Sequence, residues 1–260
     1  MSAVTSPLYM QQNQPPGVPA LSLTGERTLP DVPAENYWYR RHLAVYEWIA
    51  AHLNGGRVLD MACGEGYGAA TLAAGGAQSV VGVDANPEAY EHARLRYQGP
   101  GLSFERGLAE TWGDAGVFDT VTFLQTIEHV HDPVAVMSHF RALLAADGTV
   151  FVSTPNLLTL APQGATKSAN PWHIKEYRAH EFRELCESVF DSVELYGLFH
   201  ARKLRAHELA LRLGWDRVHK RLGLTALFYD RFTPAISTGD FELSNVRPLH
   251  AALDFVAVCH

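Results

Sequence analysis

The chain has 260 residues, of which 47% are apolar and 10% aromatic, so it can bury a sizeable core and is not disordered as a whole. Lys and Arg number 21 against 28 Asp and Glu, and the formal net charge of -7 argues against duplex nucleic acid or an anionic membrane as the main partner. The three cysteines (Cys63, Cys186, Cys259) show no zinc or redox spacing, which favours a reducing compartment. The first twenty residues hold no Lys or Arg and nowhere do eighteen apolar residues run together, so we expect a cytoplasmic protein without a membrane span.

The N-terminal part of the chain divides into a tail and a helix. Residues 1–22 are rich in Pro, Gln and Ser, a composition that cannot offset the entropy lost on ordering, so we expect a flexible tail. Within 23–55, apolar residues recur at three- and four-residue spacing from Glu35 to Leu53 and predict an amphipathic lid helix. Gly55 and Gly56 end that helix.

The middle of the chain alternates between strand and helix patterns. Short apolar runs separated by helical stretches predict six strands, at 57–61, 80–83, 102–104, 120–124, 149–153 and 192–196. This alternation is typical of βαβ units and predicts an α/β, doubly wound, mainly parallel sheet with its core in 56–200. We expect a helical acceptor-side insertion at 201–248, whose first part is basic, and a last strand within 249–260.

A glycine-rich loop follows the first predicted strand. Asp60 ends the strand, and Gly64 and Gly66 stand in the turn that follows, where a missing Cβ lets backbone approach a ligand closely. The next strand ends in Asp84, which is placed to accept hydrogen bonds from both hydroxyls of a ribose. The loop lacks the Gly-x-Gly-x-x-Gly spacing of nicotinamide dehydrogenases, so we expect a different nucleoside cofactor.

These two motifs resemble those of the class I S-adenosylmethionine-dependent methyltransferases. The likeness continues at 118–130 and 148–156, where the fourth and fifth strands of that family are expected. The resemblance implies a Rossmann-like, seven-stranded sheet with its last strand antiparallel, S-adenosylmethionine as cofactor, and methyl transfer as the activity.

The resemblance also implies which residues meet the cofactor. Gly64 and Gly66 would line its methionine part, with Asp60 near the amino group, and Asp84 would hold the ribose. The remaining implied contacts are Ala85, Leu108 and Ala109 around the adenine, the last two through backbone groups, and Gln125 at the end of the fourth strand.

A narrower resemblance concerns the methyl acceptor. Residues 23–28, 35–42 and 170–177 look like stretches of methyltransferases of glycan metabolism, including those associated with the methylglucose lipopolysaccharide pathway. It implies an O-methyltransferase that acts on a hydroxyl of a sugar or oligosaccharide. The alternatives are methylation of a small metabolite or natural product at oxygen, nitrogen or carbon, and a non-catalytic S-adenosylmethionine-binding protein.

Transfer to a hydroxyl requires a group that removes its proton. Glu128 and His129 directly follow the fourth predicted strand, and His173 lies in a loop-rich segment that can fold back over the same edge. We therefore predict His129 or His173 as general base, with Glu128 as its orienting partner. The same residues also suit a helix start with a capping histidine.

A metal-dependent version of this site stays open. Residues 125–129 resemble the Glu-x-x-Glu-His metal motif of some sugar-hydroxyl methyltransferases, with Gln125 in place of the first Glu. Losing one carboxylate weakens the binding of a hard cation such as magnesium. The basic stretch 201–221 could recognise an anionic acceptor or be a solvated helix face, and we expect no nucleic-acid partner.

Overall fold

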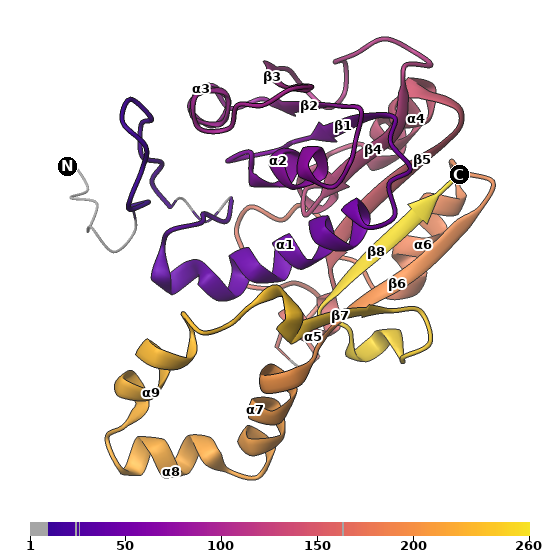
Figure 1. Cartoon of the computed structure of the whole chain (residues 1–260). Coiled ribbons are helices and arrows are strands. Elements are labelled where there is room, and N and C mark those ends of the chain that lie inside the picture. The colour runs from indigo at the N-terminus through magenta and orange to yellow at the C-terminus, as the bar shows by residue number, and fades with distance from the viewer. Residues whose placement is uncertain (1–9, 24, 26, 163) are drawn as a thin grey trace.

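One mixed sheet organises the protein (Figure 1). The computed structural model describes residues 10–23, 25, 27–162 and 164–260, and within them eight strands lie in the order β3-β2-β1-β4-β5-β8-β6-β7. The strands are β1 (Arg57–Met61), β2 (Ser79–Asp84), β3 (Leu102–Arg106), β4 (Phe118–Leu124), β5 (Leu144–Pro155), β6 (Val193–His200), β7 (Phe241–Ser244) and β8 (Asp254–Cys259). Strands β1 to β5 pair in parallel, and β8 is antiparallel to both β5 and β6. The predicted α/β, doubly wound, mainly parallel sheet with an antiparallel last strand is confirmed.

The sheet has one strand more than the seven that the family resemblance implies. β7 pairs antiparallel with β6, from Gly197 opposite Ser244 to His200 opposite Phe241, inside the stretch 201–248 that we expected to be helical. This edge strand has four residues, which is too short for an alternating apolar pattern to stand out in the sequence.

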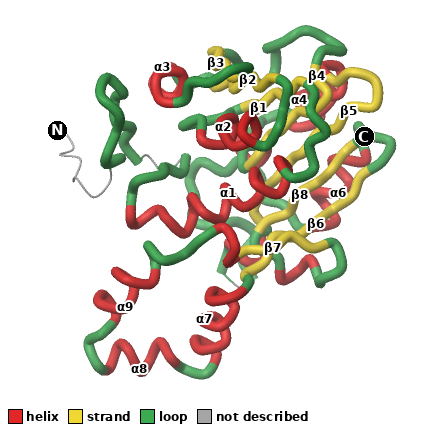
Figure 2. Tube along the Cα trace, in the orientation of Figure 1, coloured by secondary structure: helices red, strands yellow, loops and turns green. Residues whose placement is uncertain are grey.

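Helices cover both faces of the sheet (Figure 2). They are α1 (Asn36–Ala50), α2 (Tyr67–Ala74), α3 (Pro87–Arg96), α4 (Pro133–Leu143), α5 (Leu157–Leu160), α6 (Ala179–Glu187), α7 (Arg202–Arg212), α8 (Trp215–Arg221) and α9 (Thr225–Phe232), with short 3-10 turns η2 (Pro33–Glu35), η3 (Ile127–His129), η4 (Thr238–Asp240) and η5 (Leu249–Ala251). Val58 of β1 packs with buried residues of α1, α2 and α3, whereas its neighbour Leu59 packs with those of α4 and α6. Because successive side chains of a strand point to opposite faces, these are two cores, one on each side of the sheet.

Local sequence signals fix where the helices after the strands begin. Asn86 caps α3 by accepting from the backbone N–H of Glu88 at 2.9 Å, and Pro87 occupies the first turn, where no donor is needed. Asp132 caps α4 in the same way and is also followed by a proline. Both caps lie at the carboxyl edge of the parallel strands, so they also fix the loops at that edge.

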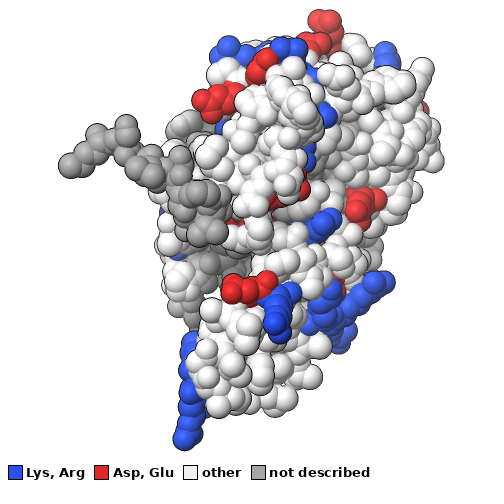
Figure 3. Space-filling view, turned by 60° about the vertical axis from the view of Figure 1, so that its left-hand side comes forward, with Lys and Arg blue, Asp and Glu red and all other residues white. Residues whose placement is uncertain are grey.

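Helices α7, α8 and α9 form an arm that extends away from the sheet (Figure 1). Lys and Arg side chains flank this arm at the bottom of Figure 3, in keeping with the basic composition of 201–221. Among the described residues, no helix is both long and apolar enough to cross a bilayer.

Part of the segment predicted as a flexible tail packs against the core. Residues 1–9 lie outside the described residues. In the range 10–22, Met10 and Ser22 form an antiparallel bridge, and Leu21 and Gln11 are only 4% and 5% exposed. Gln11 donates to the buried carboxylate of Glu65 at 2.9 Å, a tertiary partner that composition alone does not reveal.

Candidate active site

Two adjoining cavities open at the carboxyl edge of the parallel strands. The first has a volume of about 380 Å³, within the range of about 300–1,000 Å³ that is common for small-molecule pockets. Its wall combines the turns after β1, β2 and β4 with side chains of α1: Ala62, Cys63, Gly64, Asp84, Leu124, Gln125, Thr126, His42 and Tyr46. This edge is where doubly wound folds bind their ligands.

Two residues on the wall of the first cavity have unusual backbone conformations. Ala62 and Gln125, which directly follow β1 and β4, have φ angles of 59° and 52° although neither is glycine. Such left-handed conformations cost of order 1–3 kcal/mol and persist where surrounding contacts hold them. The backbone N–H of Gln125 is held by Ser153, whose carbonyl and hydroxyl oxygens accept at 3.1 and 3.0 Å.

Gly64 and Asp84 join two of these turns. The backbone N–H of Gly64 donates to Asp84 Oδ2 at 2.8 Å, and the N–H of Asn86 donates to Asp84 Oδ1 at 2.8 Å. Gly64 has φ +57°, and a Cβ built on it would have no atom within 4 Å. The loop therefore presents open backbone beside a carboxylate.

Asp60 lies behind the loop rather than on the cavity wall. Its Oδ1 accepts from Thr122 Oγ1 at 2.7 Å and from Tyr46 Oη at 3.0 Å, whereas its buried Oδ2 makes no hydrogen bond with the described residues. Complete burial raises the pKa of Asp60 to about 7, although the hydrogen bonds from Thr122 and Tyr46 oppose the shift.

The second cavity, of about 310 Å³, shares part of its wall with the first. The shared residues are Arg27, Thr28, His42, Gln125 and His129. The second cavity adds the indole of Trp38 and a set of hydrogen-bonding side chains: Glu35, Glu128, Asn170 and His173. The two cavities therefore lie side by side, with these five residues between them.

The structure brings the three candidate catalytic residues together. One donor atom each from Glu128, His129 and His173 lies within 4.8 Å of the other two, and the imidazole centroids are 5.0 Å apart. His129 Nδ1 donates to the carbonyl oxygen of Trp172 at 2.9 Å, so in the neutral ring Nε2 carries the lone pair.

The carboxylate that orients His173 is Glu176, which sequence reasoning missed. Glu176 Oε1 accepts from His173 Nδ1 at 2.7 Å, and His173 Nε2 accepts from Asn170 Nδ2 at 2.9 Å. The expected partner Glu128 instead accepts from Thr154 Oγ1 at 3.1 Å. Its side chain therefore bonds to β5, and burial raises its pKa to about 8.

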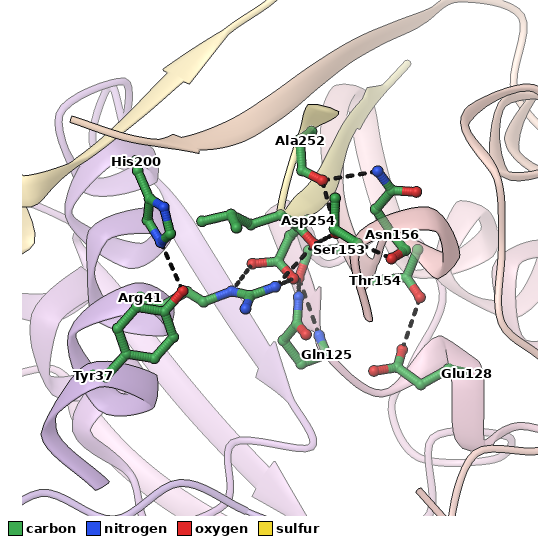
Figure 4. Close-up of polar contacts among 12 residues, drawn as sticks. Tyr37, Arg41, Gln125, Glu128, Ser153, Thr154, Asn156, His200, Ala252 and Asp254 are labelled. Atoms are coloured by element: carbon green, nitrogen blue, oxygen red, sulfur yellow. Dashed lines mark hydrogen bonds and ion pairs between the residues drawn. The ribbon is translucent and has the colours of Figure 1, made fainter. Parts of the chain in front are cut away.

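Side chains of strand β5 hold several of these groups (Figure 4). Ser153 accepts from the side-chain amide of Gln125 at 3.1 Å, and the next residue, Thr154, bonds to Glu128. Beside them Arg41 and Asp254 form a buried ion pair, with Nε–Oδ2 and Nη2–Oδ1 distances of 2.6 and 2.5 Å. This ion pair ties α1 to β8 next to both cavities.

The donor chemistry of the candidate catalytic residues does not fit magnesium. Two imidazole nitrogens and one carboxylate oxygen suit transition metals, whereas magnesium prefers oxygen ligands. A cation would also require Asn170 to release His173 Nε2.

Comparisons with known proteins give this site a family. A family model for a methyltransferase domain matches residues 37–209. The chain is 38% identical over 250 residues to a protein of Mycolicibacterium smegmatis named as a probable S-adenosylmethionine-dependent methyltransferase, a match that covers 92% of this chain and 95% of that protein. The chain belongs to the S-adenosylmethionine-dependent methyltransferases.

The methyltransferase is also similar to a second kind of relative in sequence and to a solved structure in fold. It is 32% identical over 174 residues to the ubiquinone biosynthesis O-methyltransferase of Aromatoleum aromaticum, covering 58% of this chain and 72% of that one. The crystal structure of a methyltransferase from Thermotoga maritima superposes with a TM-score of 0.58 at 16% identity, covering 86% and 91% of the two chains. The second likeness shows the shared fold alone.

The first cavity of the methyltransferase fits S-adenosylmethionine. Open backbone at Gly64 and the carboxylate of Asp84 suit the methionine part and the ribose. Asp60 and Gly66 are not among the described residues that line either cavity, and their contact with the cofactor stays a prediction. A Cβ on Gly66 would lie 2.8 Å from that of Ala93, so the loop packs closely on α3 there.

The residues expected to contact adenine do not line the first cavity. Ala85, Leu108 and Ala109 are not among its lining residues, and Leu108 is 57% exposed. Their contact with adenine stays a prediction.

Side chains of α1 and of the N-terminal segment complete the wall. His42 lines both cavities, and burial lowers its pKa to about 4, so it stays neutral at physiological pH. Thr28 Oγ1 lies 3.3 Å from His42 Nδ1 and 2.9 Å from Tyr67 Oη. Thr28 belongs to the stretch 23–28 of the narrower resemblance, which gave it no role, and it reaches the site through the packing of the N-terminal segment.

Proposed function

We propose that the methyltransferase transfers a methyl group to a hydroxyl oxygen of a sugar or oligosaccharide. The observation that carries this proposal is the second cavity, where the indole of Trp38 faces a space lined by Glu128, His129, Asn170 and His173. Aromatic faces pack against the C–H surface of sugar rings, and carboxylate, amide and imidazole groups can bond to the hydroxyls around them.

The reaction is a displacement at a methyl carbon. When bound, S-adenosylmethionine supplies that methyl on a sulfonium, so the hydroxyl oxygen forms a bond to carbon while the carbon–sulfur electron pair leaves with sulfur. The chain must align the hydroxyl with that bond, exclude water and accept the hydroxyl proton.

His129 suits the role of general base better than His173 does. It is one of the residues that line both cavities. His173 lines only the second cavity, where Glu176 and Asn170 hold its ring. We therefore assign proton removal to His129 and orientation of the acceptor to His173 and Glu128.

A second candidate is O-methylation of a small hydroxylated metabolite. The likeness to a ubiquinone biosynthesis O-methyltransferase favours it, although the match covers 58% of this chain. The two candidates differ in the acceptor and share the assignment of His129.

The test is turnover of S-adenosylmethionine on a panel of neutral and acidic oligosaccharides and small hydroxylated metabolites, with and without a chelator. We expect chelator-resistant methylation of a sugar. His129→Ala should keep cofactor binding and lose about a hundredfold or more in turnover, whereas His131→Ala, two residues on and exposed, should behave as wild type.

Each result has a defined consequence. Methylation of metabolites alone would replace the sugar acceptor with the second candidate. Full turnover in His129→Ala would remove it as the base, and loss of turnover with the chelator would overturn the metal-free assignment. Cofactor binding without turnover on any acceptor would point to a non-catalytic binding protein.

A further inference from the structure

A buried carboxylate stands in the middle of the glycine-rich loop. Glu65, between Gly64 and Gly66, is 1% exposed. Its Oε1 accepts from Gln11 Nε2 at 2.9 Å and lies 2.9 Å from His92 Nε2, and its Oε2 accepts from Tyr97 Oη at 2.8 Å. A carboxylate is buried at acceptable cost only when it is paired in this way.

These partners tie Glu65 to the N-terminal segment, which we call the strap (residues 10–23, 25 and 27–32). Gln11 is itself locked into the strap, because its Oε1 accepts from the backbone N–H of Leu21 at 3.2 Å. His92 Nδ1, on the far side of the ring from Glu65, lies 2.7 Å from the carbonyl oxygen of Pro19. Glu65 therefore contacts the strap directly through Gln11 and indirectly through His92.

An arginine of α3 fastens the strap at two more points. Arg96 lies 3.1 Å from Glu65 Oε1, donates to Gln14 Oε1 at 2.8 Å and forms an ion pair with Asp31 at 2.6 Å. Leu21, Leu29 and Val32 of the strap form a small apolar cluster of their own. Glu65 of the glycine loop and Arg96 of α3 thus hold both ends of the strap.

The downstream end of the strap forms part of the wall of both cavities. Arg27 and Thr28 line the cofactor cavity and the second cavity, and Thr28 contacts Tyr67, the first residue of α2. Glu65 itself also lines the cofactor cavity. The contacts of Glu65 therefore connect the floor of the cofactor cavity, which is the glycine loop, with the segment that encloses it.

We propose that Glu65 is a positioning residue for S-adenosylmethionine, which acts through the strap and sets how long the cofactor stays bound. Through Gln11, His92 and Arg96 it holds the strap against the glycine loop, so that Thr28 stays in place beside the cofactor. The proposal concerns cofactor binding alone, so it does not depend on the acceptor or on His129.

The test compares Glu65→Gln and Gln11→Ala with wild type by calorimetric titration and stopped-flow dissociation of S-adenosylhomocysteine. We expect each variant to raise the Kd about tenfold, mainly through faster dissociation, because Gln11→Ala removes a donor to the buried carboxylate and Glu65→Gln removes the charge that His92 and Arg96 face. Glu187→Gln is the matched control, since Glu187 is an exposed acid of α6 that pairs with Arg183. It should bind as wild type.

Two further readouts separate positioning from a general loss of stability. In wild type, bound S-adenosylhomocysteine should slow hydrogen exchange in residues 10–22, and Glu65→Gln should abolish this protection. The double variant should bind about as weakly as Glu65→Gln alone, because Gln11 contacts the loop through Glu65. Wild-type affinity in Glu65→Gln, or a hundredfold loss in the double variant, would overturn the proposal, whatever the melting temperature.

Discussion

Asp60→Asn tests the electrostatics of the cofactor cavity. Burial raises the pKa of Asp60 from its ordinary value of 3.8 to about 7. Between these values the unfolded chain has lost the proton that the folded chain keeps, so stability falls as pH rises, and the fall ends above about pH 7. With 1.36 kcal/mol per pKa unit and partial titration near pH 7, wild type should lose about 2 kcal/mol between pH 5 and 7 relative to Asp60→Asn.

The assay is urea unfolding of both proteins at pH 5, 6 and 7 without cofactor. Asn keeps the oxygen that accepts from Thr122 and Tyr46 and cannot titrate, so the difference between the two unfolding free energies isolates Asp60. A difference that stays constant over this range would refute the argument, because it would mean that Asp60 is ionised throughout and that water reaches Oδ2.

The raised pKa of Asp60 also predicts how the affinity for the cofactor changes with pH. If the cofactor's ammonium group lies near Asp60, binding favours the carboxylate and releases a proton between pH 5.5 and 7, so affinity rises with pH in this range. Titrations in two buffers of different ionisation enthalpy measure that proton. Asp60→Asn controls for titration of the ligand itself, and equal proton release in both proteins would contradict the assignment.

Three other changes have outcomes that follow from single contacts. Asp84→Ala should raise the Kd for S-adenosylmethionine tenfold or more in calorimetry, because it removes the acceptor proposed for two ribose hydroxyls and the partner of Gly64; an unchanged titration would refute the pocket. Asp254→Ala should lower the free energy of unfolding by about 3–5 kcal/mol, since it leaves the buried guanidinium of Arg41 unpaired, and a loss below 1 kcal/mol would show that water reaches this site. Gly68→Ala should reduce the melting temperature, because its Cβ would lie 2.2 Å from the ring of Tyr46; an unchanged melting temperature would mean that the ring moves freely.

The central parallel strands could be predicted because strands that are buried on both faces are apolar over most of their length, as β1 is. β1 matches the predicted range 57–61, and β2 to β5 each contain their predicted runs. β7 could not be predicted because it is short and lies at the edge of the sheet. The packing of residues 10–22 could not be predicted for a different reason, since Gln11 contacts a partner 54 residues away in the sequence.

The residues of the candidate site also include some that the sequence could place and others that it could not. The turns that follow β1, β2 and β4 meet at one edge of any doubly wound sheet, so Gly64, Asp84, Gln125 and His129 could be placed there from their positions alone. Glu176 could not, because a carboxylate three residues from a histidine in a loop gives no signal of contact. Side chains that act on a neighbour rather than on the ligand leave no pattern that the sequence alone can show.

The shared wall of the two cavities explains why such indirect contacts matter in a methyltransferase. The sulfonium activates the methyl by itself, so the chain contributes mainly alignment and exclusion of water. The five residues of that wall come from the strap, from α1, from the turn directly after β4 and from η3. No single element holds them together. Their mutual geometry depends on Glu65 at one end, through the strap, and on Ser153 and Thr154 at the other, through Gln125 and Glu128. A change at either end should therefore reduce turnover without touching the reacting atoms.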